Sequence, residues 1–517
     1  MPAVTGFVSI VGAGPWDPEL LTLAGRDRLR HAEVVIADYL VNPALLMHCP
    51  STVEVHQRVA GPRHGARLDQ DAVNALLVEK ARAGKRVVRL KGGDPCMFGR
   101  GAEEAQVLRE HGIEFELVPG VTSPIAAPEA AGIPVTHRDY TPAVTFVSGY
   151  EAYDKAGLHV EWEHLARSAG TLVLMMSVGN ARLNAERLVL AGRDPATPAA
   201  VVRWGTRGIQ RTVVGRLDDI ADRIDAEGIR PPAVLVVGEV VKLRNEIAWF
   251  EQRPLYARRV VVTRASRQAG GLVHALASRG ADAVAFPCLE VAPPLDLAAL
   301  DRAVAGFADR FDGVVLSSPN GVEAFFSSLE RSAADARALA GRLVAVVGTG
   351  TAAACRRHGI APDFVPDDAR AEGLVEHLRR ESALARRWLH VRADEGRDVL
   401  GDGIRAAGGS YTLAIGYRTI RPEIPALLVR SLRAPEDGGE GFDAVTFASG
   451  KTARHFLETL SDAIGEPEAR RLLAHAKIVT IGPVTTAAVQ ALGFQVANTA
   501  TAPTDEAVAR AVIEALG

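Results

Sequence analysis

The chain has 517 residues, which is too many for a single hydrophobic core and indicates several domains. Its 48 % hydrophobic and 23 % charged residues are typical of a water-soluble globular protein. Because the formal net charge is only −3 and the two signs are interspersed, the composition argues against a general nucleic-acid binder or a membrane-surface protein. It is compatible with a local basic cleft for an acidic small molecule.

The cysteines and the N-terminus exclude further classes. Cys49, Cys96, Cys288 and Cys355 lie far apart and form neither a CxxC motif nor a Cys/His cluster, so we expect no metal site and no disulfide framework. Residues 1–5 lack the basic start and apolar run of a signal peptide. No apolar run approaches the roughly 18 residues of a transmembrane helix, so we expect a cytoplasmic protein.

Along the chain, short β-branched apolar runs alternate with Ala-, Leu- and Arg-rich helical patterns. This alternation predicts an α/β fold whose parallel sheets are covered by helices on both faces. The segment 243–259 separates two predicted strands, and its aromatic residues predict a docked connector rather than a flexible tether. The predicted strands include Phe7–Val11, Val34–Ile36, Val87–Leu90, Val234–Val237, Val260–Thr263 and Val344–Val347.

The first glycine-rich motif, "VSIVGAGPWDPELLTLAG", places Gly12, Gly14 and Pro15 between a strand and a helix, where glycine permits a tight turn and close approach to a ligand. A dinucleotide-binding loop would need a further glycine at the position of Asp17, and a carboxylate there suits a pyrophosphate badly. The next strand ends in an acid, Asp38, as such a loop would also require. A dinucleotide site therefore stays open as the weaker alternative.

Two further loops share this character. "VVRLKGGDPCMFGRGAEE" runs from a strand into Gly92, Gly93 and Asp94, and an ordinary strand–helix turn does not need its four glycines. "LVPGVTSPIAAPEAAGIPVTHRDY" supplies Thr122 and Ser123. Both loops predict space for a ligand at the carboxyl ends of their strands.

In this order, "GAGPWDPELLTL", "ADYLV", "RLKGGDP…FGRGAEE", "VPGVTS", "AGIPVTHRD" and "LVLMMSVGN" resemble the S-adenosylmethionine-dependent tetrapyrrole methylases, and within them uroporphyrinogen-III C-methyltransferase. The resemblance covers residues 6–245. It implies two α/β domains with S-adenosylmethionine between them, and a homodimer formed through this half. It also implies that Asp38 is the proton acceptor and that the cofactor contacts Pro15, Gly92, Gly93, Asp94, Met97, Thr122, Ser123, Met176 and Gly205.

The reaction suits these residues. Methyl transfer from a sulfonium to a pyrrole carbon is a displacement that depends mainly on positioning. One carboxylate is enough to remove the ring proton afterwards. Two positions depart from the family: Trp16 stands where its first motif usually has a second glycine, and Gln57 stands where a lysine proton donor is proposed.

The second half contains an internal duplication. "FDGVVLSSPNGVEAFFSSL", from residue 311, is echoed by "FDAVTFASGKTARHFLETL", from residue 442. "LVAVVGTGTAAACRRHGI", from residue 343, is echoed by "KIVTIGPVTTAAVQALGF", from residue 477. These offsets, like that of a third and weaker pair, are about 130 residues and keep one order, which predicts two similar α/β lobes with a ligand cleft between them.

Nucleotide motifs in this half are incomplete. "SGKT" at 449–452 would need a leading glycine at Val445 to be a phosphate-binding loop. "VGTGTA" resembles a dinucleotide motif, but its duplicate carries Pro483. The loops share hydroxyl side chains at strand ends that open helices. Helix N-termini with flanking hydroxyls suit carboxylates, although each hydroxyl taken alone is better explained as a helix cap.

"RRVVVTR", "SSPNGVEAF", "VGTGTA", "PDFVPDDARAEGLVEHL", "GYRT" and "IGPVTTAAVQALGFQVANTATAPTDEAV" resemble uroporphyrinogen-III synthase over about residues 257–517. The family cyclises hydroxymethylbilane and inverts its last ring. The resemblance implies two lobes on a two-stranded connector, with the first lobe built from both ends of the segment. Tyr417 falls on the tyrosine implied to assist hydroxyl departure, and the implied substrate-binding residues are Thr263, Arg264, Ser318, Ser449, Gly482 and Thr485.

Together the resemblances imply methylase domains at 1–118 and 119–245, a connector at 246–257, one synthase lobe at 258–291 with 420–517, and the other at 292–419. We therefore expect a bifunctional enzyme that makes uroporphyrinogen III and methylates it twice to precorrin-2, for sirohaem or cobalamin. Two alternatives stay open: a later-acting corrin methylase fused to the synthase, and a tetrapyrrole-sensing protein with a degenerate methylase.

Overall fold

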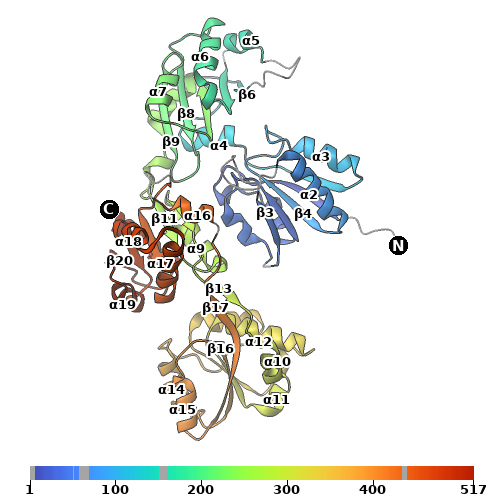
Figure 1. The fold of residues 1–517 in the computed structure, drawn as a ribbon, viewed down its shortest axis with the longest axis vertical. Coiled ribbons are helices and arrows are strands. Elements are labelled where there is room, and N and C mark those ends of the chain that lie inside the picture. The colour runs from blue at the N-terminus through green and yellow to red at the C-terminus, as the bar shows by residue number, and fades with distance from the viewer. Residues whose placement is uncertain are drawn as a thin grey trace. The chain divides into compact units, whose positions relative to one another are not determined.

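The structure is a computed structural model that describes residues 6–50, 52–57, 69–150, 160–168, 170–424, 426–433 and 439–517. It divides into two compact units, Met1–Phe286 with Pro425–Gly517, and Pro287–Ile424. The described residues form four five-stranded sheets, three in the first unit and one in the second (Figure 1). The expected α/β class is confirmed. No helix in the described part of the chain is long and apolar enough to span a membrane.

The first sheet has the strand order β3-β2-β4-β1-β5, and all of its strand pairs are parallel. Its central strands are apolar because both faces are covered. Val73 and Leu77 of α2 pack on one face, and Leu29 and Leu45 pack on the other. The elements are β1 (Phe7–Gly12), α1 (Leu23–Arg30), β2 (Val34–Ala37), η2 (Pro43–His48), β3 (Glu54–Gln57), α2 (Gln70–Arg82), β4 (Arg86–Lys91), α3 (Gly101–Glu110) and β5 (Glu114–Val118).

The second sheet, β6-β7-β10-β8-β9, corrects the expectation of parallel sheets throughout. Only β6 and β7 are parallel, whereas β10 runs antiparallel to β7 and β8, and β8 runs antiparallel to β9. Because β8 and β9 pair directly, no crossover helix lies between them, and a loop at 204–210 joins them instead. The elements are β6 (Val144–Ser148), α5 (Trp162–Arg167), β7 (Thr171–Met175), α6 (Ala181–Leu190), β8 (Pro198–Arg203), β9 (Arg211–Arg216), α7 (Ile220–Ala226), β10 (Ala233–Val237) and α8 (Arg244–Ile247).

One helix ties the first sheet to the second. α4 (Ser123–Ala130) begins just after β5, and its Ala127 packs with Val173 and Val202 of the second sheet. The connector expected at residues 246–257 is packed against the protein, because Phe250 is 3 % exposed and Leu255 is fully buried.

The third sheet, β12-β11-β18-β19-β20, is built from two separate stretches of sequence and is parallel. Leu272 of α9 and Val508 of α20 pack against Val260 in its core. The elements are β11 (Arg259–Val262), α9 (Ser266–Ala277), β12 (Asp282–Ala285), α16 (Ala426–Ser431), β18 (Ala444–Phe447), α17 (Gly450–Ile464), α18 (Glu466–His475), β19 (Lys477–Thr480), α19 (Pro483–Ala491), β20 (Asn498–Thr499) and α20 (Asp505–Leu516).

The fourth sheet, β13-β17-β16-β14-β15, forms the second unit, with α14 and α15 on one side of β16 and α10, α11 and α12 on the other (Figure 1). β13 pairs antiparallel with the end of β17. The elements are β13 (Glu290–Ala292), α10 (Leu297–Val304), α11 (Phe307–Arg310), β14 (Gly313–Leu316), α12 (Pro319–Arg331), β15 (Leu343–Val346), α13 (Thr349–Arg357), α14 (Ala371–Arg380), β16 (Arg387–Ala393), α15 (Val399–Ala406) and β17 (Ser410–Ile420).

The third and fourth sheets confirm the duplication. The parallel order β12-β11-β18-β19 corresponds strand for strand to β17-β16-β14-β15, and the sequence blocks match β14 with β18 and β15 with β19. Even the β19–β20 pair has a counterpart, because Ala345 of β15 forms a parallel bridge with Phe364.

Candidate functional site

Three glycine-rich loops meet where β4, β1 and β5 end side by side. Gly14 and Gly93 exchange two backbone hydrogen bonds, of 3.2 and 2.8 Å between nitrogen and oxygen. A Cβ on Gly120 would lie 2.3 Å from the Gly93 oxygen, and a Cβ on Gly12 would lie 2.6 Å from the Gly120 Cα. Side chains at these positions would separate the backbones, so the glycines are what lets three distant motifs form one surface.

Asp94 fastens two of these loops together. Its Oδ1 accepts hydrogen bonds from the N–H groups of Cys96 and Met97, at 2.8 and 3.2 Å, and its Oδ2 accepts one from the N–H of Gly120 at 3.1 Å. Both carboxylate oxygens are therefore engaged with the backbone. The side chain orders the loops that Gly92, Gly93, Thr122 and Ser123 belong to.

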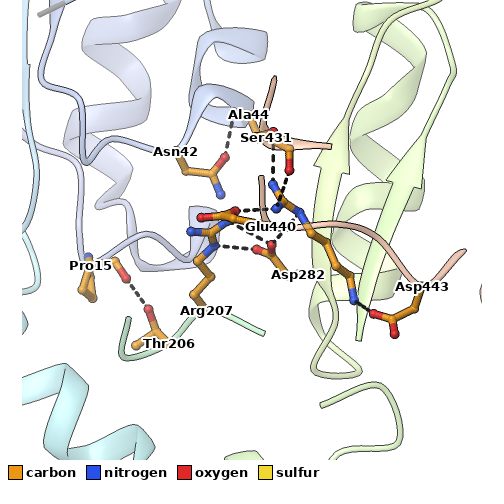
Figure 2. A network of polar contacts seen from close by, with 10 residues as sticks. Pro15, Asn42, Ala44, Thr206, Arg207, Asp282, Ser431, Glu440 and Asp443 are labelled. Atoms are coloured by element: carbon orange, nitrogen blue, oxygen red, sulfur yellow. Dashed lines mark hydrogen bonds and ion pairs between the residues drawn. The ribbon is translucent and has the colours of Figure 1, made fainter. Parts of the chain in front are cut away.

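Two other predicted cofactor residues, Pro15 and Gly205, lie where the first glycine motif contacts the loop between β8 and β9. Thr206 donates a hydrogen bond from its hydroxyl to the Pro15 carbonyl, joining the β8–β9 loop to the first motif (Figure 2). A Cβ on Gly205 would lie 2.3 Å from the Cβ of Ala127, so glycine is required for this loop to lie against α4. Met176, which directly follows β7, is 52 % exposed.

Backbone strain gathers in these loops. Nine non-glycine residues of the described chain have positive φ, and six of them are Trp16, Phe98, Arg100, Met176, Trp204 and Thr206. Such conformations are uncommon for side-chain-bearing residues and cluster at binding and catalytic sites. Three of these residues lie in the glycine motifs, two lie in the β8–β9 loop, and Met176 follows β7.

The predicted proton acceptor belongs to a buried cluster of charges. Asp38 follows β2, and its Oδ1 lies 2.6 Å from a terminal nitrogen of Arg89. Arg89 Nε lies 3.1 Å and Lys91 Nζ 2.8 Å from Glu104 Oε1. The side chains of Arg89 and Glu104 are fully buried, whereas that of Asp38 is 20 % exposed. The cluster is thus anchored in the core and presents one carboxylate at its open end.

Burial and neighbouring charges act on these groups in opposite directions. Burial first, and the Arg89 charge second, lower the pKa of Lys91. Burial opposes the charge of Arg89 as well, but the Asp38 and Glu104 carboxylates more than offset it and raise the pKa of that guanidinium. Arg89 therefore stays a cation and holds Asp38 by a charge-assisted hydrogen bond.

Gln57, at the position where a lysine proton donor is proposed for the family, lies beside the end of the strand that precedes Asp38. It is exposed at the end of β3, and its register partner on β2 is Ala37, the residue before Asp38. The position is therefore close to Asp38, but an amide cannot supply a proton as an ammonium group can.

The third sheet collects five of the predicted substrate-binding residues at the carboxyl ends of its neighbouring strands. Thr263 is fully buried and donates to the Thr446 carbonyl at 2.7 Å, and Arg264 forms an ion pair with Asp505. Ser449 caps α17 in a reciprocal arrangement with Thr452. These three side chains stabilise the lobe itself. Gly482, the N-cap residue of α19, has open space around it, and Thr485 is buried in the first turn of that helix.

The fourth sheet brings Tyr417 and Ser318 together. Their hydroxyl oxygens lie 2.8 Å apart, although the residues are 99 positions apart in sequence. Ser318 caps α12, and its oxygen accepts the N–H of Gly321 at 3.1 Å. Tyr417 lies where β17 shifts register against β16, near Ala393. The cap fixes the serine, and the serine in turn orients the tyrosine.

Several residues of these sites were not predicted from the sequence, although two of them carry a recognisable pattern. Arg89 and Lys91 interrupt an otherwise apolar strand two positions apart, which places them on one face, and charged residues buried in pairs need partners. Trp204 and Arg207 flank Gly205 but belong to no glycine motif.

Comparison with known proteins places both halves. Residues 8–221 match the family described as Tetrapyrrole (Corrin/Porphyrin) Methylases, and residues 271–510 match the family described as Uroporphyrinogen-III synthase HemD. A porphyrin biosynthesis protein HemD of Ruminiclostridium josui is 37 % identical over 377 residues, which are 72 % of this chain and 74 % of that protein. A uroporphyrinogen-III C-methyltransferase of Bacillus subtilis is 39 % identical over 341 residues, 66 % of this chain and 69 % of the relative. An S-adenosyl-L-methionine-dependent uroporphyrinogen III methyltransferase of Methanosarcina barkeri is 47 % identical over 249 residues, 48 % of this chain and 96 % of that protein.

The buried charge cluster predicts a large stability difference between two matched substitutions. Glu104→Gln leaves two buried cations with one carboxylate, so we expect the local free energy of unfolding of β4 to fall by about 3 kcal/mol. Glu116→Gln is the control. The side chains of Glu116 and its ion-pair partner Arg28 are 30 % and 38 % exposed, so this pair should contribute less than about 1 kcal/mol. Native-state hydrogen exchange of the β4 amides measures both. Equal losses in the two variants would contradict the interdependence of the cluster.

Proposed function

Since the chain belongs to the tetrapyrrole methylase family in its first half and to the uroporphyrinogen-III synthase family in its second half, we propose that it performs two consecutive steps of tetrapyrrole synthesis. The second half cyclises hydroxymethylbilane to uroporphyrinogen III. The first half methylates that product twice with S-adenosylmethionine, which gives precorrin-2. One chain thus makes a macrocycle and modifies it.

The observation that carries the methylase assignment is the meeting of three glycine loops at one sheet edge, with an anchored carboxylate on the next strand. The donor set fits S-adenosylmethionine: exposed loop backbone, the hydroxyls of Thr122 and Ser123, and Met176 offer hydrogen-bonding and apolar contacts. Pro15, Gly92, Gly93, Met97 and Gly205 would complete this site, with Asp94 holding its loops in place. When bound, the cofactor supplies an electrophilic methyl group.

The chain's own residues then handle a proton. Methylation makes the attacked pyrrole carbon quaternary and leaves a positive charge on the macrocycle, which is neutralised when a proton leaves another carbon or nitrogen of the ring system. Asp38 is placed to accept that proton on a carboxylate oxygen. Arg89 fixes the orientation of that carboxylate through Oδ1, so little reorganisation is needed as the proton moves. Asp38 and Arg89 are already ordered in the folded protein, so substrate binding does not have to supply the free energy for ordering them.

In the synthase half, Tyr417 is the proposed acid for departure of the substrate hydroxyl. If Ser318 donates to the Tyr417 oxygen, the phenolic hydrogen faces outward and can pass to the leaving hydroxyl, which departs as water. Ser318 already accepts the Gly321 N–H, and this leaves its own hydrogen for the tyrosine. We propose that positioning of the reactive bilane contributes more than this proton transfer.

We also propose that the chain works in the cytoplasm as a homodimer through its methylase half. Its partners would then be small tetrapyrroles rather than nucleic acid or membrane. The product serves either sirohaem or cobalamin synthesis.

A product assay tests the function and its two rivals. Purified protein is incubated with hydroxymethylbilane and S-adenosylmethionine, and the oxidised products are separated by chromatography. Methylated products of the type III isomer are expected. Uroporphyrin I as the only product would overturn the synthase assignment. Unmethylated uroporphyrin III would overturn the methylase assignment, and it is the product expected if the first half is a sensor or a later-acting methylase.

The role of Asp38 predicts a selective defect. Asp38→Asn removes the proton acceptor but keeps a partner for Arg89, so we expect methylation to slow by about 100-fold. The control Asp27→Asn alters an exposed carboxylate on α1 and should leave the rate unchanged. Cyclisation by the same samples reports that the chain has folded. Full methylation by Asp38→Asn would exclude Asp38 as the base.

The Ser318–Tyr417 pair predicts a graded defect in the other activity. Tyr417→Phe should slow cyclisation by about tenfold and raise the share of the type I isomer, because unassisted closure then competes. Ser318→Ala should have a smaller effect in the same direction. Tyr411→Phe, on the same strand but bonded to buried His390, is the control. If Tyr417→Phe and Tyr411→Phe gave the same isomer ratio, Tyr417 would have no role in hydroxyl departure.

A further inference from the structure

A cluster of four charges, three of them buried and the fourth, Glu440, 39 % exposed, joins the β8–β9 loop to the third sheet (Figure 2). Arg207 binds Asp282 through two parallel contacts, Nε to Oδ1 at 2.6 Å and a terminal nitrogen to Oδ2 at 2.9 Å. The same terminal nitrogen lies 3.1 Å from Glu440. Arg259 also pairs with Glu440, and its Nε lies 3.3 Å from Asp282. Two arginines thus neutralise two carboxylates.

The cluster is a docked interface. The side chains of Asp282, Arg207 and Arg259 are 1 %, 5 % and 6 % exposed. Backbones meet beside it, because a Cβ on Gly208 would lie 2.0 Å from the Asp282 nitrogen. The N–H of Ala257 also donates to the Gly208 carbonyl at 2.9 Å. The methylase loop and the first lobe of the synthase therefore share one packed boundary.

The opposite side of Arg207 contacts the first glycine motif. Its guanidinium carbon lies 4.4 Å from the ring centroid of Trp16 and 4.7 Å from that of Trp204, and the two indoles meet edge to face at 5.7 Å. Next to it, Thr206 donates to the Pro15 carbonyl. A guanidinium can stack its face on aromatic rings while its edge binds a carboxylate. Arg207 does both.

Trp16 gains an explanation from this contact. Its φ is 80°, a conformation that favours the glycine usual at this position of the family. The strain persists because the indole packs against Trp204 and Arg207. One of the two substitutions that depart from the family pattern thus contacts Arg207, which in turn contacts the synthase half.

We propose that Arg207 is a positioning residue that couples the methylase's cofactor loop to the synthase half, so that affinity for S-adenosylmethionine depends on the Arg207–Asp282 contact. The inference rests on the proposed cofactor site at Pro15 and Gly205. Arg207 packs against Trp16 and Trp204, which directly follow Pro15 and precede Gly205 in the chain, and Asp282 holds Arg207. Loss of the carboxylate contact frees the loop, which cofactor binding must then order again.

The first test compares two Arg→Lys variants of the full chain. Arg207→Lys keeps the charge but loses the bidentate contact and the planar stack, so we expect the KM for S-adenosylmethionine and the Kd for S-adenosylhomocysteine to rise about tenfold, with kcat changed much less. Arg182→Lys alters an exposed ion pair on α6 and should leave both constants unchanged. Equal constants in the two variants would overturn the proposal. Failure of the unmodified chain to bind S-adenosylhomocysteine would instead overturn the cofactor site.

A double-mutant cycle separates coupling from local damage. Trp16→Gly removes the indole that stacks on Arg207 and gives the backbone the residue that its conformation favours. Asp282→Asn removes the carboxylate charge that binds the nitrogens of Arg207. If both act through Arg207, their combined effect on the Kd for S-adenosylhomocysteine is smaller than the product of the single effects. If the effect of the double variant on this Kd equalled the product of the two single effects, Trp16 and Asp282 would act independently, and the proposal would be wrong.

Hydrogen exchange of the unmodified chain supplies a test that no folding defect can obscure. Because coupling is reciprocal, saturating S-adenosylhomocysteine should slow exchange of amides around 281–283 in the synthase half. Exchange around 343–346, in the other unit, is the internal control. Slower exchange confined to the methylase loops would contradict the coupling.

Discussion

The close contact among Gly12, Gly93 and Gly120 is the constraint on which the first half depends. Three strands that are adjacent in the sheet end together, and the absence of side chains lets their loops touch. Asp94 then ties two of these loops by its two carboxylate oxygens. The proposed cofactor site rests on this arrangement, and the β8–β9 loop joins it through the hydrogen bond from Thr206 to the Pro15 carbonyl. Methyl transfer needs positioning above all, and this surface is fixed by backbone packing.

The second half solves a related problem by repetition. Two lobes with the same parallel strand order place hydroxyl-bearing loops at the carboxyl ends of their strands. Ser318 and Ser449 occupy equivalent positions and cap equivalent helices, yet only Ser318 has Tyr417 as a neighbour. The duplication therefore explains the scaffold, and the departure from it marks the residue proposed for chemistry.

The sequence predicted the α/β class, the family of each half and the duplication, because these depend on periodicity and on glycine motifs that are local in the chain. It did not predict the antiparallel pairs of the second sheet, since an apolar strand reads the same in either direction. For the proposed sites, it singled out Asp38 and Tyr417 but not Arg89, Glu104 or the contact of Ser318 with the tyrosine. Those partners are set by tertiary packing between residues 15 to 99 positions apart. From the sequence we also assigned Asp94, Thr263 and Arg264 to ligand binding, and in the structure each of these side chains contacts other residues of the protein.

Trp16 shows how a departure from a family pattern acquires meaning only in three dimensions. Considered alone, it argued for a damaged cofactor loop or an altered substrate, because it adds bulk where glycine is usual. In the fold, its indole faces Arg207 and Trp204, and Arg207 reaches a carboxylate from a different catalytic half. The positive φ persists here because the indole packs against Trp204 and Arg207, and Arg207 in turn binds Asp282.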